Sequence, residues 1–376
     1  MVWTGCSTDS ENQSEGAQSV NEETHPIPDQ IPHADTSPLQ AKEADACDLS
    51  DIPESLRALQ QHIHEEQTDL KRMPIDVSEH QMARVGSMDA DHIIVIDTKP
   101  PASKSSVYHR ATDTASLIAE AGEGPGEINF PTDVAVDARR VYIAMGTQRI
   151  AAFSCASGVC DHEEDIRVEF QPTALAMADD HFVTTGMLPL RGETEISSLS
   201  GAIHRVDMSG DHIDSFGEAY QTEAWLVNEF FTRNSSLVSF DDGSYAVHYD
   251  IIPRLYVYGA DHTLRKVLEI DNFEQPTFEY EDGRRSILQE ENYSRVTQLN
   301  ALEGNLAFLT VTTRSNTSAE LTEYVYDHYL MGVESGCVSH IGTEEEKAEG
   351  GARWVPTDHH LLRIEAGSVY MGETEG

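Results

Sequence analysis

The chain has 376 residues, which is enough for two average domains or for one large all-β domain. It carries 66 Asp and Glu residues against 25 Lys and Arg residues, so its formal net charge is −41 at pH 7. Binding of DNA or RNA needs basic stripes on the surface, and this charge therefore excludes nucleic acid as an expected partner.

The acidic residues run through the whole chain and mix with apolar residues instead of forming one acidic tail. Among the basic residues, Arg far outnumbers Lys. Both features resemble proteins of salt-loving bacteria, in which molar salt shortens the Debye length to about 3 Å and screens self-repulsion. In dilute buffer the same charge is expected to destabilise the fold.

Residues 1–47 are expected to be a lipoprotein-like N-terminus followed by a disordered acidic linker. Residues 3–6 read Trp-Thr-Gly-Cys and resemble a bacterial lipobox, in which Cys6 receives lipid. Residues 7–46 are polar and lack periodic apolar residues. A secretory signal also needs an apolar stretch of roughly 7–15 residues, which the five residues before Cys6 cannot supply. Either the true start lies upstream, or Cys6 is an ordinary cysteine of a cytoplasmic protein.

Residues 48–376 are expected to form one domain that begins with a short helix over 51–64. Leu56, Leu59 and Ile63 recur there at partly helical spacing, and Pro53 suits a first turn. After residue 75, short alternating apolar runs are separated by turn phrases such as DAD, DARR, DDG and SGD. Strands of about five residues at intervals of 8–12 residues indicate an all-β fold. The clearest expected strands are 92–96, 106–109, 134–136, 141–144, 203–206, 255–258, 306–311 and 324–330.

A weak repeat sets the architecture. The phrase FPTDVAVD (130–137) returns as FQPTALAMAD (170–179). A unit of about 40–50 residues with four strands is typical of a β-propeller blade. The body of the chain is long enough for six blades of about 50 residues each.

Residues 121–153 resemble the NHL-type propeller repeat. The matching parts are Gly122, Gly124 and Gly126, then Phe130-Pro131, the strand VAVD (134–137), Tyr142-Ile143, and RIAAF (149–153). The acidic and Asn residues usual before the last part are absent. With the lipobox-like start and the DIPESL segment, the chain resembles six-bladed, TolB-like propeller lipoproteins of Bacteroidota-type bacteria. The resemblance implies an all-β, six-bladed propeller of four-stranded blades in an extracytoplasmic, lipid-anchored protein.

The glycines of this stretch are interpreted as the crossing between two blades and not as a phosphate cradle. A phosphate loop needs a helix N-terminus after its glycines, whereas Pro131 and a β-branched strand follow here. Glu123 and Glu127 would also repel an anion. The apolar VAV run is expected to be buried between neighbouring blades.

The end of the chain supplies only about two strands (352–376), so the last blade needs a partner from elsewhere. We expect an N-terminal strand at about 73–85 to close the ring. If it does not, five blades are the alternative.

Cys155 and Cys160 stand between two strand-like runs. A four-residue hairpin loop would place them opposite each other, at a distance that a disulfide can close. Such a bond suits an oxidising compartment. Two free thiols are the alternative, and no cysteine spacing of the redox or metal type occurs.

No cofactor is predicted, although calcium is possible, and both calcium at the acidic turns and zinc at the histidines are considered. Short-spaced oxygen ligands occur at 207–211 and 241–243, but neither segment has the twelve-residue loop with a distal Glu, so we interpret both as polar turns. The histidines at 62, 64, 359 and 360 lack a third zinc ligand at suitable spacing. No G-x-S-x-G motif occurs, and no catalytic residue is predicted.

The expected ligand-facing cluster lies where a loop crosses one face of the disc, just before the strand PRLYVY. It comprises His248, Tyr249, Asp250 and Arg254, with Asn228 and Arg233 as weaker candidates. Most aromatic residues of 225–280 are interpreted as blade core.

The expected function is a monomeric binding or scaffold module on the periplasmic or extracellular face. Its expected partner is an envelope protein, a peptide or a glycan, and a lipid on Cys6 is its only expected link to the membrane. The alternative is a calcium- or zinc-dependent hydrolase or lyase, such as a lactonase. That alternative needs inward carboxylates, Asn or His at equivalent strand ends, for which Asp133, Asp179 and Asn228 are the nearest candidates.

Overall fold

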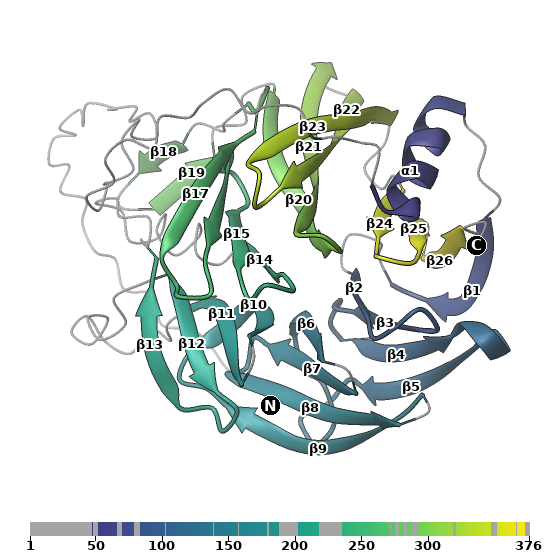
Figure 1. The fold of residues 1–376 in the computed structure, drawn as a ribbon, viewed down its shortest axis with the longest axis vertical. Helices are drawn as coiled ribbons and strands as arrows, with labels where there is room; N and C mark the ends of the chain where they lie inside the picture. The colour runs from purple at the N-terminus through teal and green to yellow at the C-terminus, as the bar shows by residue number, and fades with distance from the viewer. Residues whose placement is uncertain are drawn as a thin grey trace, which may run out of the picture.

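The computed structural model describes Cys47 and residues 52–65, 70–78, 83–101, 103–137, 139–156, 158–178, 180–187, 202–217, 235–270, 272–274, 278–281, 284–287, 292–318, 321–346, 352–365 and 367–372. The linker expected over 1–47 lies outside these ranges apart from Cys47. Within them the chain forms six four-stranded antiparallel sheets around a central axis and one α-helix, α1 (Glu54–Glu65), as Figure 1 shows. The prediction of a six-bladed, all-β propeller with a short N-terminal helix is confirmed.

Each blade is a sheet whose first strand lies nearest the axis. Blade 1 contains β2 (Ala83–Ser87), β3 (His92–Asp97), β4 (Lys104–His109) and β5 (Thr114–Glu120), with a 3-10 turn at Arg110–Thr112. Blade 2 contains β6 (Pro131–Asp137), β7 (Arg140–Met145), β8 (Arg149–Ala156) and β9 (Val159–Arg167). Blade 3 contains β10 (Gln171–Ala178), β11 (His181–Met187), β12 (Ile203–Asp207) and β13 (His212–Phe216).

Blade 4 contains β14 (Ser235–Ser239), β15 (Tyr245–Tyr249), β16 (Arg254–Tyr258) and β17 (Leu264–Glu269). A two-stranded sheet, β18 (Phe278–Glu281) with β19 (Arg284–Ile287), precedes blade 5 in the chain. Blade 5 contains β20 (Asn292–Leu302), β21 (Leu306–Ser318), β22 (Leu321–Gly332) and β23 (Cys337–Glu346). Blade 6 contains β24 (Arg353–Pro356), β25 (Leu361–Glu365), β26 (Ser368–Gly372) and β1 (Leu70–Asp76).

The N-terminal part of the chain closes the ring in two ways. Strand β1 pairs antiparallel with β26 and so forms the outer strand of blade 6. The closing segment expected at 73–85 therefore spans the end of β1 and the start of β2, the inner strand of blade 1. A disulfide between Cys47 and Cys337, 290 residues apart, also joins the segment before α1 to β23 of blade 5. Strand β1 is thus held by hydrogen bonds to blade 6, and Cys47 by a covalent bond to blade 5.

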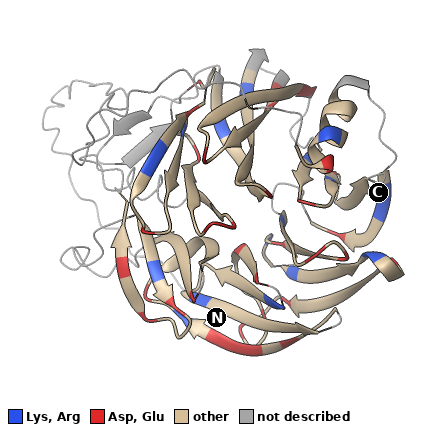
Figure 2. Ribbon diagram, viewed as in Figure 1, with Lys and Arg blue, Asp and Glu red and all other residues tan. Residues whose placement is uncertain are grey.

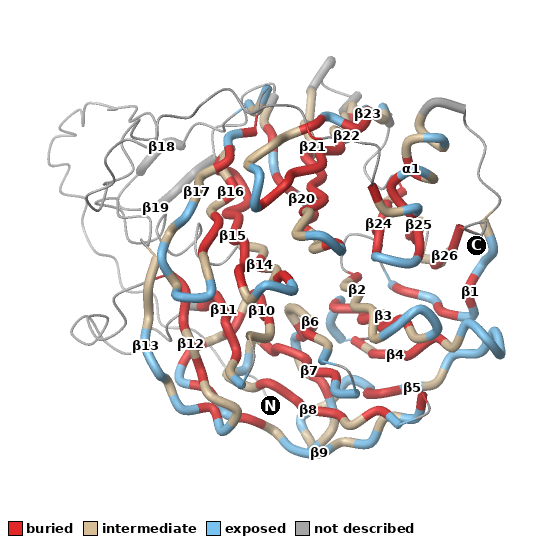
Figure 3. Tube along the Cα trace, in the orientation of Figure 1, coloured by how far each residue is buried: buried red, intermediate tan, exposed pale blue. Residues whose placement is uncertain are grey.

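Burial follows the position of a strand within its blade, as Figure 3 shows. In β7, residues 141–145 are at most 1% exposed, because neighbouring blades cover both faces. The inner strand β6 differs. Its Ala135 is buried, but Val134 and Val136 are only partly buried because they line the central channel. The expectation that the whole VAV run is buried between blades is wrong for these two valines.

The glycine-rich stretch is the crossing from β5 to β6, and a glutamate of the chain itself fills it. Glu127 Oε2 accepts a hydrogen bond from the Gly124 amide at 2.7 Å. A Cβ on Gly122 would lie 2.0 Å from the same oxygen, so a side chain there would displace the carboxylate. Arg149 of β8 donates to the Glu127 carbonyl at 2.7 Å and forms an ion pair with Asp165 at 3.2 Å. The loop therefore locks blade 1 to blade 2.

Cys155 and Cys160 are directly opposite each other on β8 and β9 and form a disulfide with a Cα separation of 4.0 Å. The strand pairing continues to Ala156 and Val159, so the hairpin loop is two residues long and not four. Gly158 has a φ of 76°, a value that suits glycine in so tight a turn.

Candidate ligand-binding funnel

The inner strands of the six blades surround a central channel of about 260 Å³. Because side chains alternate along a strand, each inner strand presents polar groups to the axis. At least one polar residue from every blade lines the channel: Arg84, Asp133, Thr173, Ser235, Ser236, Gln298 and Arg353.

At the face where the inner strands begin, the channel adjoins a wider cavity of about 550 Å³. Blade 5 builds one wall of it, because β21 and β22 are 13 and 12 residues long and exceed the strands of the other blades. This wall carries Thr310, Thr312, Arg314, Tyr324, Tyr326 and His328. Both cavities share Arg84, Thr173, Ser235, Ser236, Thr297, Gln298 and Arg353 in their linings, and we call them together the funnel.

Three inner strands carry a threonine at a shift in strand register. The shifts fall at Thr132 in β6, Thr173 in β10 and Thr297 in β20. Such a bulge re-aims a side chain out of the regular alternation. Thr132 Oγ1 donates to the Pro172 carbonyl at 2.9 Å, and Thr297 Oγ1 lies 2.8 Å from Thr312 Oγ1. The bulges therefore fix hydroxyl groups around the mouth of the channel.

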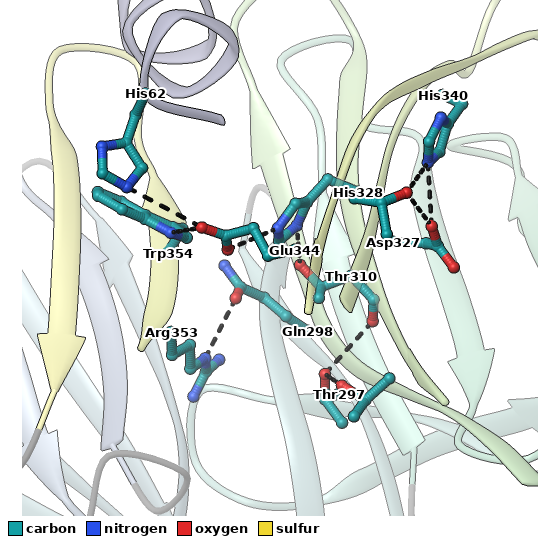
Figure 4. Close-up of polar contacts among 12 residues, drawn as sticks. His62, Thr297, Gln298, Thr310, Asp327, His328, His340, Glu344, Arg353 and Trp354 are labelled. Atoms are coloured by element: carbon teal, nitrogen blue, oxygen red, sulfur yellow. Dashed lines mark hydrogen bonds and ion pairs between the residues drawn. The ribbon is translucent and has the colours of Figure 1, made fainter. Parts of the chain in front are cut away.

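Two guanidinium groups meet inside the funnel. Nη1 of Arg84 and Nη1 of Arg353 both donate to the carbonyl of Ala83, at 3.2 and 2.7 Å. Arg353 Nε also donates to Gln298 Oε1 at 3.2 Å, a contact drawn in Figure 4. Burial and the neighbouring charge of Arg84 lower the pKa of Arg353 to about 9, although Asp133 opposes the shift. A pKa of about 9 keeps Arg353 positively charged at neutral pH.

The carboxyl group of Asp133 lines the same channel from β6. Burial raises its pKa to about 6, against the opposing charges of Arg84 and Arg353. Its Oδ2 accepts a hydrogen bond from the Leu175 amide at 2.9 Å, which ties the inner strands of blades 2 and 3 together. Asp133 is thus mostly ionised at pH 7 and titrates in mild acid.

A chain of polar contacts runs from the funnel wall to α1 (Figure 4). Thr310 Oγ1 lies 3.1 Å from His328 Nδ1, and His328 Nε2 lies 3.2 Å from Glu344 Oε2. The other Glu344 oxygen accepts a hydrogen bond from Trp354 Nε1 at 3.1 Å and lies 4.0 Å from His62 of α1. Burial acts to raise the pKa of Glu344, but the contacts with His328, Trp354 and His62 outweigh it and lower that pKa. This series of polar contacts holds blade 5, blade 6 and α1 together behind the funnel wall.

The ligand-facing cluster expected from the sequence is spread over different environments. His248 is 1% exposed and lies 2.8 Å from the Ile252 carbonyl inside blade 4, and Tyr249 is part of the apolar core of the same blade. Arg254 lies on β16 and pairs with Glu269 at 3.3 Å, away from the funnel lining. Asp250 does line the funnel, where it pairs with Arg295. The weaker candidates, Asn228 and Arg233, lie outside the described residues.

The acidic turns considered for calcium act as hydrogen-bond acceptors for their own backbone. Asp207 Oδ1 accepts bonds from the amides of Ser209 and Asp211, at 2.8 and 2.9 Å. Asp242 Oδ1 accepts a bond from the Ser244 amide at 2.9 Å. Among the described residues, no group of three or more His, Cys, Asp or Glu side chains is arranged to hold a metal ion. Of the carboxylate set considered for a catalytic metal, Asp133 lies in the channel, and residues 179 and 228 lie outside the described ranges.

The described helix α1 is too short to cross a membrane, and no other described helix is long and apolar enough to do so. The two disulfides are consistent with an extracytoplasmic location.

The fold and the site define the chain as a six-bladed β-propeller with a polar axial funnel. No family model and no curated protein matches its sequence. Solved structures match its fold. A protein of Bacteroides fragilis described as exported has a TM-score of 0.53 and 11% identity, over 88% of this chain and 98% of that chain. A member of the DUF4221 family from Bacteroides vulgatus has a TM-score of 0.51 and 8% identity, over 81% and 97%. At such identities the likeness shows the fold alone.

Sequence reasoning missed Arg84, Gln298 and Arg353. A signal was present, because the dipeptide Ala-Arg occurs at 83–84 and at 352–353, at the start of both inner strands. Arg84 and Arg353 each stand three residues before the end of an inner strand. Aligning the inner strands by their ends would have paired the two arginines.

Proposed function

We propose that the chain is an exported, lipid-anchored β-propeller that binds a ligand in its funnel and acts as a monomeric binding or scaffold module of the cell envelope. The observation that carries this proposal is the convergence of polar side chains from all six inner strands on two adjoining cavities of about 260 and 550 Å³. Cavities of a few hundred Å³ with convergent polar groups are typical of small-molecule sites.

The proposed location rests on the cysteine chemistry and on one protein of similar fold. Cys47 pairs with Cys337 and Cys155 with Cys160, so Cys6 is the cysteine left over from these two pairs. Disulfides persist in oxidising compartments, and the lipobox-like residues around Cys6 suit lipid attachment there. The similar fold of a Bacteroides fragilis protein described as exported agrees. Palmitate labelling of the wild type and of Cys6→Ser tests the anchor, and a lack of label in both would remove it.

Ligand binding is tested by thermal unfolding of the chain in molar KCl with panels of glycans, peptides and small acids. A ligand that binds only the folded state raises the unfolding midpoint by mass action. Ser236→Trp places a large side chain in the lining of both cavities and should abolish that rise. Ala115→Trp, on the exposed outer strand β5, is the matched control and should keep it. A ligand that stabilises both variants equally binds elsewhere and contradicts a funnel site.

A hydrolase or lyase is the second candidate, because a carboxyl group and an imidazole, those of Asp133 and His328, line the funnel. Asp133 has a pKa of about 6 there, and His328 contacts both Thr310 and Glu344. A carboxyl group whose pKa is raised by burial in a cavity is a candidate for general acid–base catalysis. Thermal unfolding with EDTA and then with added Ca²⁺ or Zn²⁺, followed by lactone and ester assays of wild type, Asp133→Asn and His328→Gln, tests this candidate. Turnover that both substitutions abolish would favour the enzyme over the binding module.

A further inference from the structure

The funnel does not share the strong negative charge of the molecule, because its lining holds four arginines (Arg84, Arg295, Arg314 and Arg353) and three aspartates (Asp133, Asp250 and Asp358). The chain carries a net charge of −41, and outer arginines are matched by acids, as in the pairs Arg140–Glu163, Arg205–Asp214 and Arg265–Asp261. Within the described ranges, neither Arg84 nor Arg353 takes part in an ion pair. In so acidic a chain, two adjacent arginines that form no ion pair within the described ranges call for a specific cause.

A purely structural role does not account for both guanidiniums. They share one acceptor, the Ala83 carbonyl, so one of them would be enough to satisfy it. Two like charges at this range repel each other, and the repulsion grows as the surroundings exclude water. Nε and Nη2 of Arg84 and Nη2 of Arg353 donate to no acceptor among the described residues. These groups line the cavity and remain available to a ligand.

We propose that Arg84 and Arg353 bind the anionic group of the funnel's ligand, a carboxylate, sulfate or phosphate carried by a small organic molecule. The inference rests on the proposed ligand-binding function and names the chemistry of that ligand. The planar fork of N–H donors on a guanidinium matches such oxyanions. Gln298 orients Arg353 through the 3.2 Å contact with its Nε. An anion between the two arginines would also offset their mutual repulsion.

The mouth of the funnel supplies contacts for the rest of the molecule. Tyr293 and Tyr326 line the wider cavity beside the shared arginines. Arg295 lies there too, but its charge is taken up by Asp250. The two channel arginines are therefore the stronger positions for the anionic group.

The test is isothermal titration of the full chain with matched sugars at one KCl concentration, the lowest at which the chain stays folded. Glucuronate, glucose 6-sulfate and glucose 6-phosphate are compared with glucose, so that the carboxylate, sulfate and phosphate arms share one body. We expect at least one anionic sugar to bind at least about tenfold tighter than glucose. Arg84→Gln and Arg353→Gln should each weaken that binding about tenfold or more. Arg265→Gln, an exposed position that loses the same charge, should leave it unchanged.

A variant that is expected to tighten binding, and not to weaken it, keeps the test independent of folding defects. Asp133→Asn removes the negative charge beside the arginines, and its side-chain oxygen can still accept the Leu175 hydrogen bond. It should tighten binding of the anionic sugar by about 3- to 10-fold, which a misfolded protein could not do.

Three results would overturn the inference. They also distinguish failure of the anion site from failure of the proposed ligand binding in the funnel. Equal effects of the anionic sugars on wild type, Arg84→Gln and Arg353→Gln would show a general salt effect. Binding of a neutral ligand that Ser236→Trp abolishes, with no preference for anions, would refute the anion site and leave the binding module standing. If Ser236→Trp changes the binding of no probe, charged or neutral, both the anion site and the proposed ligand binding in the funnel are refuted.

Discussion

Buried histidines make single residues of this fold sensitive to acid. Burial lowers the pKa of His248 to about 3, although its contact with the Ile252 carbonyl opposes the shift. Burial and the charge of His212 lower the pKa of His204 to about 4. Both are neutral in the folded chain but take up a proton near pH 6.5 in the unfolded chain. Their contribution to stability is therefore complete above pH 6.5 and is lost as pH falls from 6.5 toward the folded-state values.

Replacing His248 should reduce this sensitivity. One histidine with such a shift contributes about 1.4 kcal/mol per pH unit below 6.5. We expect the loss of unfolding free energy between pH 7 and pH 5 to be about 2 kcal/mol smaller in His248→Gln than in the wild type. Urea titrations at the two pH values and constant KCl measure it, with the exposed His359→Gln as control. An unchanged pH dependence in His248→Gln would contradict the argument.

At the scale of elements, the crossing between blades 1 and 2 shows why the glycine-rich motif ends in Arg-Ile. Arg149 is largely buried, and it binds the Glu127 carbonyl and the Asp165 carboxylate at once. Arg149→Ala removes this donor from both acceptors and leaves Asp165 with His162, 3.2 Å away, and we expect a loss of about 1–3 kcal/mol in unfolding free energy. Arg149→Lys should fall between, because a lysine keeps the charge but not the fork. Denaturant unfolding of these variants beside the exposed Arg139→Ala measures the effect. A loss no greater than that of Arg139→Ala would rule out a locking role.

Individual strands were predictable from the sequence where the local alternation of apolar residues and the turn residues determine them. Runs such as 92–96 and 141–144 lie inside β3 and β7, because alternation and turn residues act over a few positions. The funnel was not predictable in the same way. Arg84 and Arg353 are 269 residues apart and meet only because β1 completes blade 6 and brings blade 1 beside it. His248 has a polar side chain in a loop-like phrase, yet the phrase is part of a core strand, so residue type misled the interpretation.

The whole ring depends on how its ends are joined. The Cys47–Cys337 disulfide closes a loop of 290 residues, and Cys155–Cys160 closes one of five. In the chain-entropy account, the long loop corresponds to about 6 kcal/mol and the short one to about 2 kcal/mol. We expect Cys47→Ser with Cys337→Ser to lower the unfolding free energy more than Cys155→Ser with Cys160→Ser. Denaturant unfolding of the two double variants checks the order, and the reverse order would show that the N-terminal segment is held without its disulfide.

The charge of the whole molecule gives the last prediction. Acidic side chains gather on exposed strands such as β9, which reads VCDHEEDIR, and Figure 2 shows them along the outer edge of blade 2. With a net charge of −41, this surface repels itself, and salt shortens the range of the repulsion from about 10 Å at 0.1 M to about 3 Å at 1 M. We expect the thermal midpoint to rise by about 5–10 °C between 0.1 and 2 M KCl. Scanning calorimetry measures the rise.

Arg84→Gln separates the two effects of salt on this chain. Screening acts on the whole surface, so the variant should gain as much from KCl as the wild type, whereas its binding of an anionic sugar should be about tenfold weaker or more. Sucrose at matched osmolality, which carries no charge, should give a smaller rise than KCl. A midpoint that does not respond to KCl, or one that responds only when Arg84 is present, would show that the acidic surface does not limit stability.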